Sequence, residues 1–435
     1  MHYLERLIPL QHSPVAVAAA LSATSECDHV AYEEPDQLSF AEDPLWDFAF
    51  SDAGEVARIS EKLSEVDVAE WRAYGWAKFE LAVTPRGGMP TDDALLRLMI
   101  PRREVRIRDG IARLRGVTED DLHRLEERLI PLEPREPVGW HQMEPILNGD
   151  STEGYKAVVA KGVEAIRAGV FDKVILSRVV EVPFEVDLAR TYLAGRAGNT
   201  PARSFLLSLG GWEATGFSPE IVTRVTPSGE VTAQPLAGTR AFGADEQLNQ
   251  RNREELYRDH KEVFEHAISV RLAAEELLTV CAPSSVTVDE FMNVRERGSV
   301  QHLASRLSGL LATGGSEWGA FAALFPAITA SGIPKRAACD FIRRSEPARG
   351  LYSGAVLALG FDGELDAALV LRSVFRHGGR TWLRAGAGVV GESTPARELE
   401  ETCEKLRSVS RYLVEHRPHD LAGHGRLEAR HAEKA

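Results

Sequence analysis

Short runs rich in strand-forming residues, separated by turn sequences, dominate the last part of the chain. Three consecutive runs span residues 352–359, 366–376 and 381–390, with turns at Asp362-Gly363 and Gly378-Gly379 between them. Runs of this length that are bounded by turns predict strands. Because two-residue turns join neighbouring strands as hairpins, the pattern predicts an antiparallel sheet rather than parallel strands with helical crossovers.

Helical periodicity interleaves with these strands. Apolar residues of 154–168 recur at helical spacing and gather on one side, and an apolar strand at 174–180 follows directly. A further strand covers 204–211, and a long helical stretch covers about 249–280. Hairpin-linked strands with helices between them define the α+β class.

The first part of the chain carries weaker signals. Helical patterns and strand-like runs occur at 54–65, 75–83, 104–117 and 119–128. Asp109-Gly110 predicts a hairpin turn inside the third of these, and Thr118 predicts the N-cap of the fourth. A connection rich in proline and polar residues follows. We therefore divide the chain into a region that completes the sheet and helix framework, a catalytic region and a polar tail predicted to be disordered: residues 1–150, 151–417 and 418–435.

Composition and charge restrict the classes of partner. The chain has 435 residues, of which 44% are hydrophobic and 27% charged, as in ordinary globular proteins with a large core. The net charge is −14 and no long basic run occurs, which argues against a nucleic-acid partner. An anionic substrate would need a local cationic pocket or a metal ion.

Cysteine usage and hydropathy indicate the compartment. The four cysteines lie far apart without metal-ligand spacing, as is typical of a reduced cytosolic protein. No apolar run reaches the ~18 residues of a membrane span. The apolar stretch 15–23 follows an acidic residue and prolines, which is a poor signal peptide. We expect a cytoplasmic protein with no membrane partner.

The stretch from Arg380 to Leu406 is the most suggestive part of the sequence. A strand containing Gly386 and Gly388 would let a ligand approach the backbone, and a helix with Pro395 at its first position follows. On this helix Glu398, Glu401 and Lys405 share one face, and the two adjacent carboxylates would favour a cation. The alternatives are carboxylates that complement the helix dipole and an ordinary Glu401–Lys405 pair.

The spacing Gly386-x-Gly388-x-x-Gly391 also matches a dinucleotide-binding fingerprint. We reject this interpretation because no second parallel strand follows the helix. A pyrophosphate would also face two glutamates with no cation between them.

A second acidic pair lies on the long helix. Glu262 and Glu265 repeat the three-residue spacing, and Glu265 shares a face with apolar residues, where a carboxylate needs a compensating partner. Two acidic pairs on two helices can build a site made only of oxygen ligands, which favours Mg²⁺. The alternative is two solvated helix faces.

Other polar residues occupy positions where chemistry is plausible. Lys173 lies at the mouth of an apolar strand and is either a base or a strand-edge lysine that extends to solvent. Glu220 is either a general acid or a turn carboxylate. Arg372 lies among apolar residues, where an unpaired charge is costly, so an anion or an internal acid must meet it. The remaining candidates are anion donors or pocket residues: Gly238, Thr239, Tyr352 and His302.

Several motifs in this order resemble one family. They are KVILSR, GFSPE, PLAGTR, KEVFEHAISVR, FMNVRERGSVQHL, LFPAITASGIPK, RGLYSGAV, LDAALVLRS, WLRAGAGVV and RELEETCEKL. Together they resemble the chorismate-utilising enzymes, which include anthranilate, aminodeoxychorismate, isochorismate and salicylate synthases. The likeness is dense from Ser151 to Val414 and weaker before it.

Within this family the chain most resembles the salicylate synthases. Lys173 matches a water-activating lysine that the amine-forming members lack. Ala237 stands where aminodeoxychorismate synthases have a lysine. The sequence FPAITASG at 325–332 differs from the His-Pro-Thr-Pro pattern of typical isochorismate synthases.

The resemblance implies a fold and a reaction. The fold would be α+β, with antiparallel β-sheets packed as a sandwich and helices on the outside. The enzyme would add water at C2 of chorismate with loss of the C4 hydroxyl, giving isochorismate, and then eliminate pyruvate to give salicylate. Lys173 would activate the water and Glu220 would protonate the departing hydroxyl.

The resemblance also implies the ligands of the site. Mg²⁺ would be bound by Glu265 and Glu401, with Glu262 and Glu398 acting through waters. The ring carboxylate of chorismate would meet Mg²⁺ and the Gly-Thr turn, and the enolpyruvyl carboxylate would meet an arginine, a tyrosine, a lysine and bare backbone. These substrate-binding residues, with two that line the pocket, are Gly238, Thr239, His302, Thr329, Tyr352, Arg372, Gly386, Gly388 and Lys405.

Alternative functions stay open at this point. An isochorismate synthase would use the same residues and stop after the first step. Anthranilate synthase component I would need a glutaminase partner, and Lys173 argues against it. A relative that only binds or regulates would be expected to have lost a catalytic residue, and none is lost. We expect a monomer without a glutaminase subunit. The resemblance implies that the salicylate feeds siderophore biosynthesis or the synthesis of another natural product.

Overall fold

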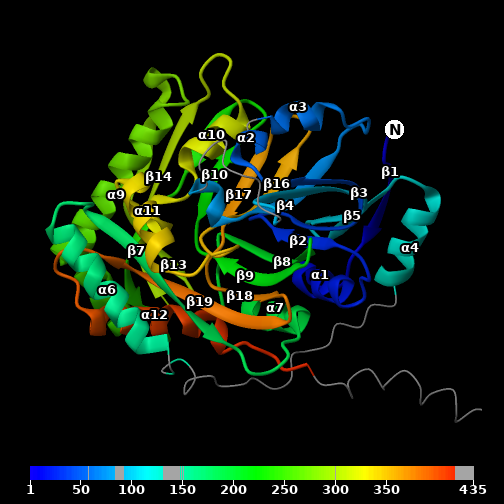
Figure 1. The fold of residues 1–435 in the computed structure, drawn as a ribbon. Coiled ribbons are helices and arrows are strands. Elements are labelled where there is room, and N and C mark those ends of the chain that lie inside the picture. Colours follow the sequence, from blue (N-terminus) through cyan, green and yellow to red (C-terminus); the bar gives the residue numbers. More distant parts are fainter. Residues whose placement is uncertain are drawn as a thin grey trace, which may run out of the picture.

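The structure is a computed structural model that describes residues 1–56, 58–83, 93–130, 147, 149, 151–298 and 300–416. The tail at 418–435 and most of the connection at 133–150 lie outside the described residues. All strand pairings among the described residues are antiparallel, and helices are interleaved with the strands, as Figure 1 shows. The α+β class with an antiparallel sheet is therefore confirmed.

Strand pairing is continuous through the molecule. The strands are β1 (Leu4–Pro9), β2 (His29–Glu33), β3 (Leu38–Phe50), β4 (Arg72–Ala77), β5 (Leu96–Arg108), β6 (Ile111–Gly116), β7 (Lys173–Glu181), β8 (Arg203–Leu209), β9 (Trp212–Ser218), β10 (Ile221–Val225), β11 (Glu230–Ala233), β12 (Leu236–Ala241), β13 (Thr287–Arg297), β14 (Val300–Leu310), β15 (Gly332–Ile333), β16 (Ala355–Gly360), β17 (Leu365–Leu369), β18 (Ser373–His377) and β19 (Arg380–Val389). They pair in the order β15-β7-β19-β18-β9-β8-β2-β3-β5-β4-β16-β17-β10-β11-β14. β14 also pairs with β12 and β13, and β5 also pairs with β6, which holds β1.

The two halves of this series face one another across a hydrophobic core. Phe205 and Phe375 enter the core from β8 and β18, and Trp76 and Val356 enter it from β4 and β16. Figure 1 shows β8, β9 and β18 in one layer and β4, β16 and β17 in the other. The expected sandwich is thus formed by one series of paired strands that folds over on itself.

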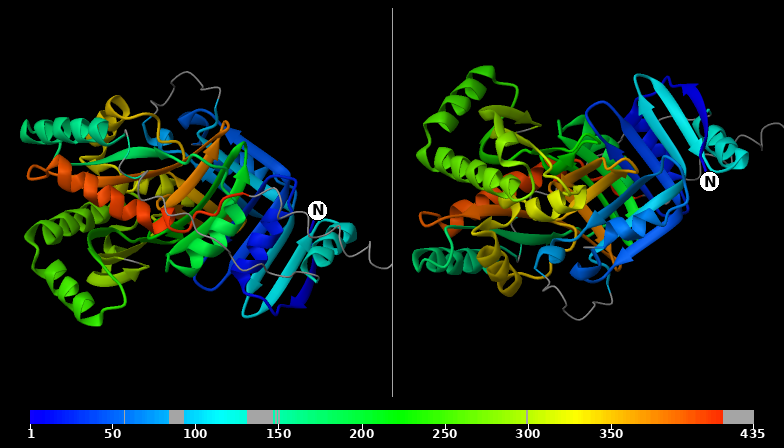
Figure 2. Two further views of the ribbon diagram at one scale, coloured as in Figure 1. Left: turned by 90° about the horizontal axis from the view of Figure 1, so that it is seen from below. Right: turned by 90° about the horizontal axis from the view of Figure 1, so that it is seen from above.

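Helices cover the outer faces of the sandwich (Figure 2). They are α1 (Pro14–Ala23), α2 (Ala53–Val56), α3 (Ile59–Ser64), α4 (Glu119–Leu129), α6 (Ser151–Arg167), α7 (Leu188–Ala197), α8 (Glu246–Arg258), α9 (His260–Leu278), α10 (Glu317–Leu324), α11 (Lys335–Ser345) and α12 (Pro395–Ser410). α1, α4, α7 and α12 share one apolar cluster with β18 and β19, whereas α9 and α10 pack on the opposite face against β10 and β17. No helix among the described residues is long and apolar enough to cross a membrane.

Strands from the first part of the chain lie inside the series. β2 lies between β3 and β8, and β4 lies between β5 and β16. Residues before and after position 150 therefore share the same backbone hydrogen-bond network, so the first part is built into the sandwich.

Local signals placed several elements correctly. Thr118 forms a capping box with Asp121 at the start of α4, because each side chain accepts from the backbone of the other. Asp109 and Gly110 take φ values of 50° and 75° in the hairpin between β5 and β6. Pro395 is the first residue of α12, as predicted.

Other predicted elements were wrong in their extent. The helix at 54–65 is divided into α2 and α3, since Arg58 at the start of α3 is not helical. The strand at 75–83 ends at Ala77, and a 3₁₀ turn at Phe79–Ala82 follows. The long helix at 249–280 is interrupted at Asp259, whose extended backbone ends α8 and whose side chain caps α9.

Candidate active site

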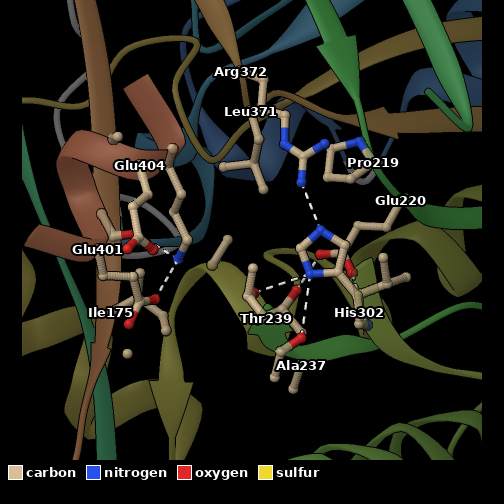
Figure 3. Close-up of a pocket in the computed structure, with 18 of the residues that line it drawn as sticks. Ile175, Pro219, Glu220, Ala237, Thr239, His302, Leu371, Arg372, Glu401 and Glu404 are labelled. Atoms are coloured by element: carbon tan, nitrogen blue, oxygen red, sulfur yellow. Dashed lines mark hydrogen bonds and ion pairs between the residues drawn. The ribbon is translucent and has the colours of Figure 1, made fainter. Parts of the chain in front are cut away.

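A pocket between α9 and α12 collects the polar residues singled out by sequence. Figure 3 shows Glu401 on one side of it and His302 with Arg372 on the other. The lining residues that the sequence predicted are Lys173, Glu220, Gly238, Thr239, Glu262, Glu265, His302, Thr329, Tyr352, Arg372, Gly386, Gly388, Glu401 and Lys405. Glu398 is the one predicted residue outside this lining, one turn before Glu401 on α12.

The amine of Lys173 is buried and paired. Lys173 begins β7, its side chain is 4% exposed, and its Nζ lies 2.6 Å from Oε1 of Glu265 on α9. Gly388 in β19 leaves room for this pair, because a Cβ there would lie 3.0 Å from the same Glu265 oxygen. The lysine therefore points into the pocket, and the alternative of a strand-edge lysine extending to solvent does not hold.

Lys405 links the helix α12 to the glycine-rich strand. Its Nζ donates to Oε1 of Glu401 at 2.7 Å and to the carbonyl of Gly386 at 2.9 Å. Burial alone would raise the pKa of Glu401. The charge and hydrogen bond of Lys405, together with the charges of Lys261 and Arg397, hold that pKa below its usual value. Glu401 is therefore a carboxylate at neutral pH.

Two further carboxylates crowd the same region. Burial and then the charge of Glu265 raise the pKa of Glu262, whose Oε1 accepts from Arg240 at 3.2 Å. Burial and then the charge of Glu401 raise the pKa of Glu398, which is 1% exposed. Both pKa values are raised mainly because the carboxyls are buried, and the neighbouring carboxylates add to the rise.

Among the described residues, each of the four carboxylates forms one ion pair within 4 Å. Besides the three pairs above, Lys261 Nζ lies 3.8 Å from Oε1 of Glu398. Within the described residues, no group of three or more histidine, cysteine, aspartate or glutamate side chains is arranged as a finished metal site. Three of the four predicted ligands thus line one pocket, with Glu398 one helical turn away, and lysines and an arginine pair with all four.

The donor set nevertheless fits a hard divalent cation. Among the described residues, neither side-chain oxygen of the buried Glu398 has a well-formed hydrogen-bond partner. A buried carboxylate without well-formed donors is costly unless a cation meets it. Oxygen ligands on two facing helices are the chemistry that Mg²⁺ prefers.

A bulge in β12 presents Gly238 and Thr239 to the pocket. The register of β12 against β14 shifts between Ala237 and Thr239, and Gly238 takes a φ of 77° that favours glycine. His302 on β14 lies behind this bulge, with Nδ1 3.0 Å from Thr239 Oγ1 and 3.3 Å from the Gly238 carbonyl. The bulge and the histidine form one hydrogen-bonded unit.

Arg372 determines the tautomer of His302. Arg372 Nη2 lies 2.6 Å from Nε2 of His302, and since a guanidinium can only donate, Nε2 must accept. The ring proton therefore resides on Nδ1, facing the Gly238 carbonyl and the Thr239 hydroxyl. Burial, and then the charge of Arg372, hold the pKa of His302 well below its usual value, so the ring is neutral.

Arg372 is half-buried and forms no ion pair with a carboxylate among the described residues. Its Nη1 donates to the Arg297 carbonyl at 3.2 Å, and burial followed by the charge of Arg297 lowers its pKa to about 10. The predicted single strand at 366–376 is wrong here, because β17 and β18 are separated at Arg372, whose φ is 50°. This kink directs an uncompensated positive charge to the pocket, where an anion would meet it.

Glu220 lies between β9 and β10 with 2% of its surface exposed. Its Oε2 accepts from the backbone N–H of Leu236 at 2.9 Å, and its Oε1 accepts from the hydroxyl of Thr329. Burial raises its pKa to about 7, and these hydrogen bonds, Lys173 and Arg372 limit the rise. A carboxyl with this pKa can donate or accept a proton near neutral pH.

Two buried arginines lie over the ring of Tyr352. It precedes β16 rather than beginning it, and its hydroxyl approaches Gly386 so closely that a Cβ there would lie 2.9 Å away. The guanidinium Cζ atoms of Arg349 and Arg384 lie 5.7 and 5.5 Å from the centre of its ring, and both arginines form ion pairs with Glu346. The sequence did not single out this network, because Leu383 to Val389 of β19 are all buried and Arg384 lies inside an apolar run.

Comparison with known proteins defines the class of this chain. The family model described as chorismate binding enzyme matches residues 16–411. The chain belongs to this family and is an enzyme that binds chorismate. The resemblance stated from the motifs is therefore confirmed.

The chain is similar in sequence or fold to several individual members of this family. The chain is 45% identical to a salicylate synthase of Mycolicibacterium paratuberculosis, over 82% of this chain and 78% of that protein. It is 32% identical to an anthranilate synthase component 1 of Pseudomonas putida, over 73% of this chain and 64% of that protein. The fold matches the menaquinone-specific isochorismate synthase of Escherichia coli with a TM-score of 0.75 at 22% identity, covering 94% of each chain.

Proposed function

We propose that this protein is a salicylate synthase that converts chorismate to isochorismate and then to salicylate and pyruvate. The 45% identity to a salicylate synthase over most of both chains supports this activity. The observation that carries it is the pair Lys173 and Glu220, a buried amine and a buried carboxyl with a pKa of about 7, which line the same pocket.

In the first half-reaction these two residues divide the proton transfers. Lys173, once it is neutral, takes a proton from the water that attacks C2 of chorismate. Glu220, in its protonated form, delivers a proton to the hydroxyl that leaves C4. A carboxyl whose pKa lies near 7 is protonated in a useful fraction at neutral pH and still a competent donor.

The cationic and backbone groups of the pocket suit a substrate with two carboxylates. Arg372, Tyr352, Lys405 and the bare backbone at Gly386 and Gly388 would bind the enolpyruvyl carboxylate. The donors of the β12 bulge, at Gly238 and Thr239, would bind the ring carboxylate. Neutral His302 contributes by holding the Arg372 guanidinium in place, 2.6 Å from its Nε2.

We further propose Mg²⁺ as the cofactor. Glu265 and Glu401 would bind it directly, and Glu262 and Glu398 through waters. The ion would supply positive charge that neutralises the ring carboxylate and polarises the substrate. Glu265 and Glu401 are also the ion-pair partners of Lys173 and Lys405, so with the ion bound these two amines would be available to water and substrate.

Pyruvate elimination would follow within the same pocket by an intramolecular hydrogen shift, so it requires no additional catalytic residue. The second candidate is an isochorismate synthase that releases the intermediate, because Lys173 and Glu220 account for the first step by themselves. We propose a cytoplasmic monomer without a glutaminase subunit, in which residues 1–150 complete the framework and the salicylate serves siderophore biosynthesis.

The test is to incubate the purified protein with chorismate and Mg²⁺, with and without ammonia, and to separate the products by liquid chromatography. Salicylate and pyruvate in equal amounts, independent of ammonia, are expected. Accumulation of isochorismate alone would establish the second candidate, and anthranilate formed with ammonia would overturn both.

A further inference from the structure

We propose that Thr329 is a positioning residue for Glu220: its hydroxyl fixes the carboxyl and sets the pH range in which the acid holds its proton. This inference rests on the proposed role of Glu220 as general acid. It differs from the expectation that Thr329 contacts the substrate, because the hydroxyl of Thr329 is already committed to Glu220.

Glu220 is held at both of its oxygens. The Leu236 N–H donates to Oε2 at 2.9 Å and the Thr329 hydroxyl donates to Oε1. A carboxyl oxygen has two lone-pair directions, so these donors occupy one on each oxygen and leave the others for the transferable proton. The carboxyl plane is therefore fixed by two elements, β12 and the 3₁₀ turn at Ile328–Ala330.

Hydrogen bonds that do not involve Glu220 hold the turn that carries Thr329. Nη1 of the buried Arg349 donates to the carbonyl of Ala330 at 2.8 Å, and the Ser331 hydroxyl donates to the carbonyl of Ala327 at 2.8 Å. Neither contact involves Glu220. Thr329 is thus presented from a rigid support, as a group must be to fix the position of another.

The charged groups that face Glu220 are few. Lys173 on β7 and Arg372 between β17 and β18 are the charged side chains that act on its pKa, and both are positive. Each has its own partner, since Lys173 pairs with Glu265 and Arg372 donates to His302. Among the described residues, Thr329 supplies the side-chain hydrogen bond to the Glu220 carboxyl, so removing its hydroxyl isolates one interaction.

The consequence has a definite sign. A hydrogen bond to the ionised form of a carboxyl favours that form, so the Thr329 hydroxyl lowers the pKa of Glu220 against the effect of burial. Without the hydroxyl the pKa rises, and the acid keeps its proton to higher pH. A general acid loses activity as pH rises through its pKa, so the descending limb of the pH profile should move upward.

Two variants separate this role from a packing role. Thr329→Val keeps the shape and removes the donor, and Thr329→Ser keeps the donor. For Thr329→Val we expect the descending limb of the kcat profile to move up by about one pH unit. We also expect kcat at neutral pH to fall about tenfold, because the carboxyl of Glu220 is no longer held in position. Thr329→Ser should restore the position of the limb. Ser331→Ala, which removes a hydrogen bond from the same turn without touching Glu220, is the matched control.

A measurement that needs no turnover separates this proposal from the proposed function. The infrared carboxyl absorbance of the protein minus that of its Glu220→Gln variant reports the protonation of Glu220 across a pH titration. An upward displacement of this titration in the Thr329→Val background supports the proposal, and an identical titration in both backgrounds overturns it. If the wild-type protein did not convert chorismate at all, the proposed function would fail while this titration still decided the role of Thr329.

Discussion

Arg372 Nη2 donates to Nε2 of His302 across 2.6 Å, and this contact connects the kink between β17 and β18 with the bulge of β12. Since Nε2 is occupied, Nδ1 of the neutral ring faces Thr239 and Gly238. The proposed donors for the two carboxylates of chorismate are therefore parts of one hydrogen-bonded network rather than separate sites.

Replacement of Arg372 by lysine tests this network. A lysine keeps the charge but cannot donate to both the Arg297 carbonyl and His302 while facing an anion, because it lacks the planar fork of arginine. We expect KM for chorismate to rise about 10- to 100-fold, since a hydrogen bond to a charged group contributes about 1.5–3 kcal/mol. Steady-state kinetics measures this, and Arg376→Lys, whose partner is Glu213, is the control. An unchanged KM would exclude Arg372 from substrate binding.

Lys173→Met should strongly slow water addition without weakening metal binding. The variant lacks a base, so we expect the rate of isochorismate formation to fall by a factor of about 10² to 10⁴. Removing the amine also frees the Glu265 oxygen that it contacts at 2.6 Å, so the calorimetric Kd for Mg²⁺ should stay the same or decrease. Lys156→Met on α6, where Lys156 is half-exposed and pairs with Glu153, is the control. Turnover at the parent rate would show that another group activates the water.

Glu401→Gln should weaken the binding of Mg²⁺. The substitution removes a charge from the proposed ligand and leaves Lys405 bonded to the Gly386 carbonyl. We expect the Kd for Mg²⁺ to rise about tenfold or more, with a matching shift in the Mg²⁺ dependence of activity. Glu400→Gln removes the same charge from the exposed face of α12, where Glu400 pairs with Arg397. Equal Mg²⁺ affinity in both variants would contradict the assignment of Glu401.

Glu220→Gln should remove activity and yet stabilise the fold at alkaline pH. Burial raises the pKa of Glu220 from 4.5 to about 7, so between these values the folded state binds a proton that the unfolded chain does not. The stability contributed by the protonated group is therefore complete below about pH 4.5 and lost as pH rises to about 7, a loss of about 3 kcal/mol.

The amide introduced by Glu220→Gln does not ionise, so the variant should have a higher Tm than the wild type at pH 8 and a similar Tm at pH 5. Differential scanning calorimetry at the two pH values measures this difference. A Tm advantage of equal size at both pH values would mean that the carboxyl is not buried in its neutral form.

Some of the fold could be predicted from the sequence because the signals act locally. The Asp109-Gly110 hairpin and the Thr118 capping box depend on residues within a few positions, and both form as expected. The break at Asp259 was missed because helical periodicity continues through it. An aspartate inside such a pattern can equally lie on a solvated face, and only its contacts with the amides of α9 identify it as a cap.

The features of the candidate site likewise divide into those that local sequence predicts and those that depend on the tertiary structure. The amino-acid sequence by itself determined which side chains are available, because spacing on strands and helices dictates which groups share a face, as Glu398 and Glu401 do on α12. Only the tertiary structure decided their partners: Lys173 with Glu265, Arg372 with His302 and Thr329 with Glu220 join residues 92, 70 and 109 positions apart. Such contacts arise from strand pairing and helix packing. A local sequence pattern describes only neighbouring residues, so it cannot predict the distance between two side chains that are so far apart in the chain.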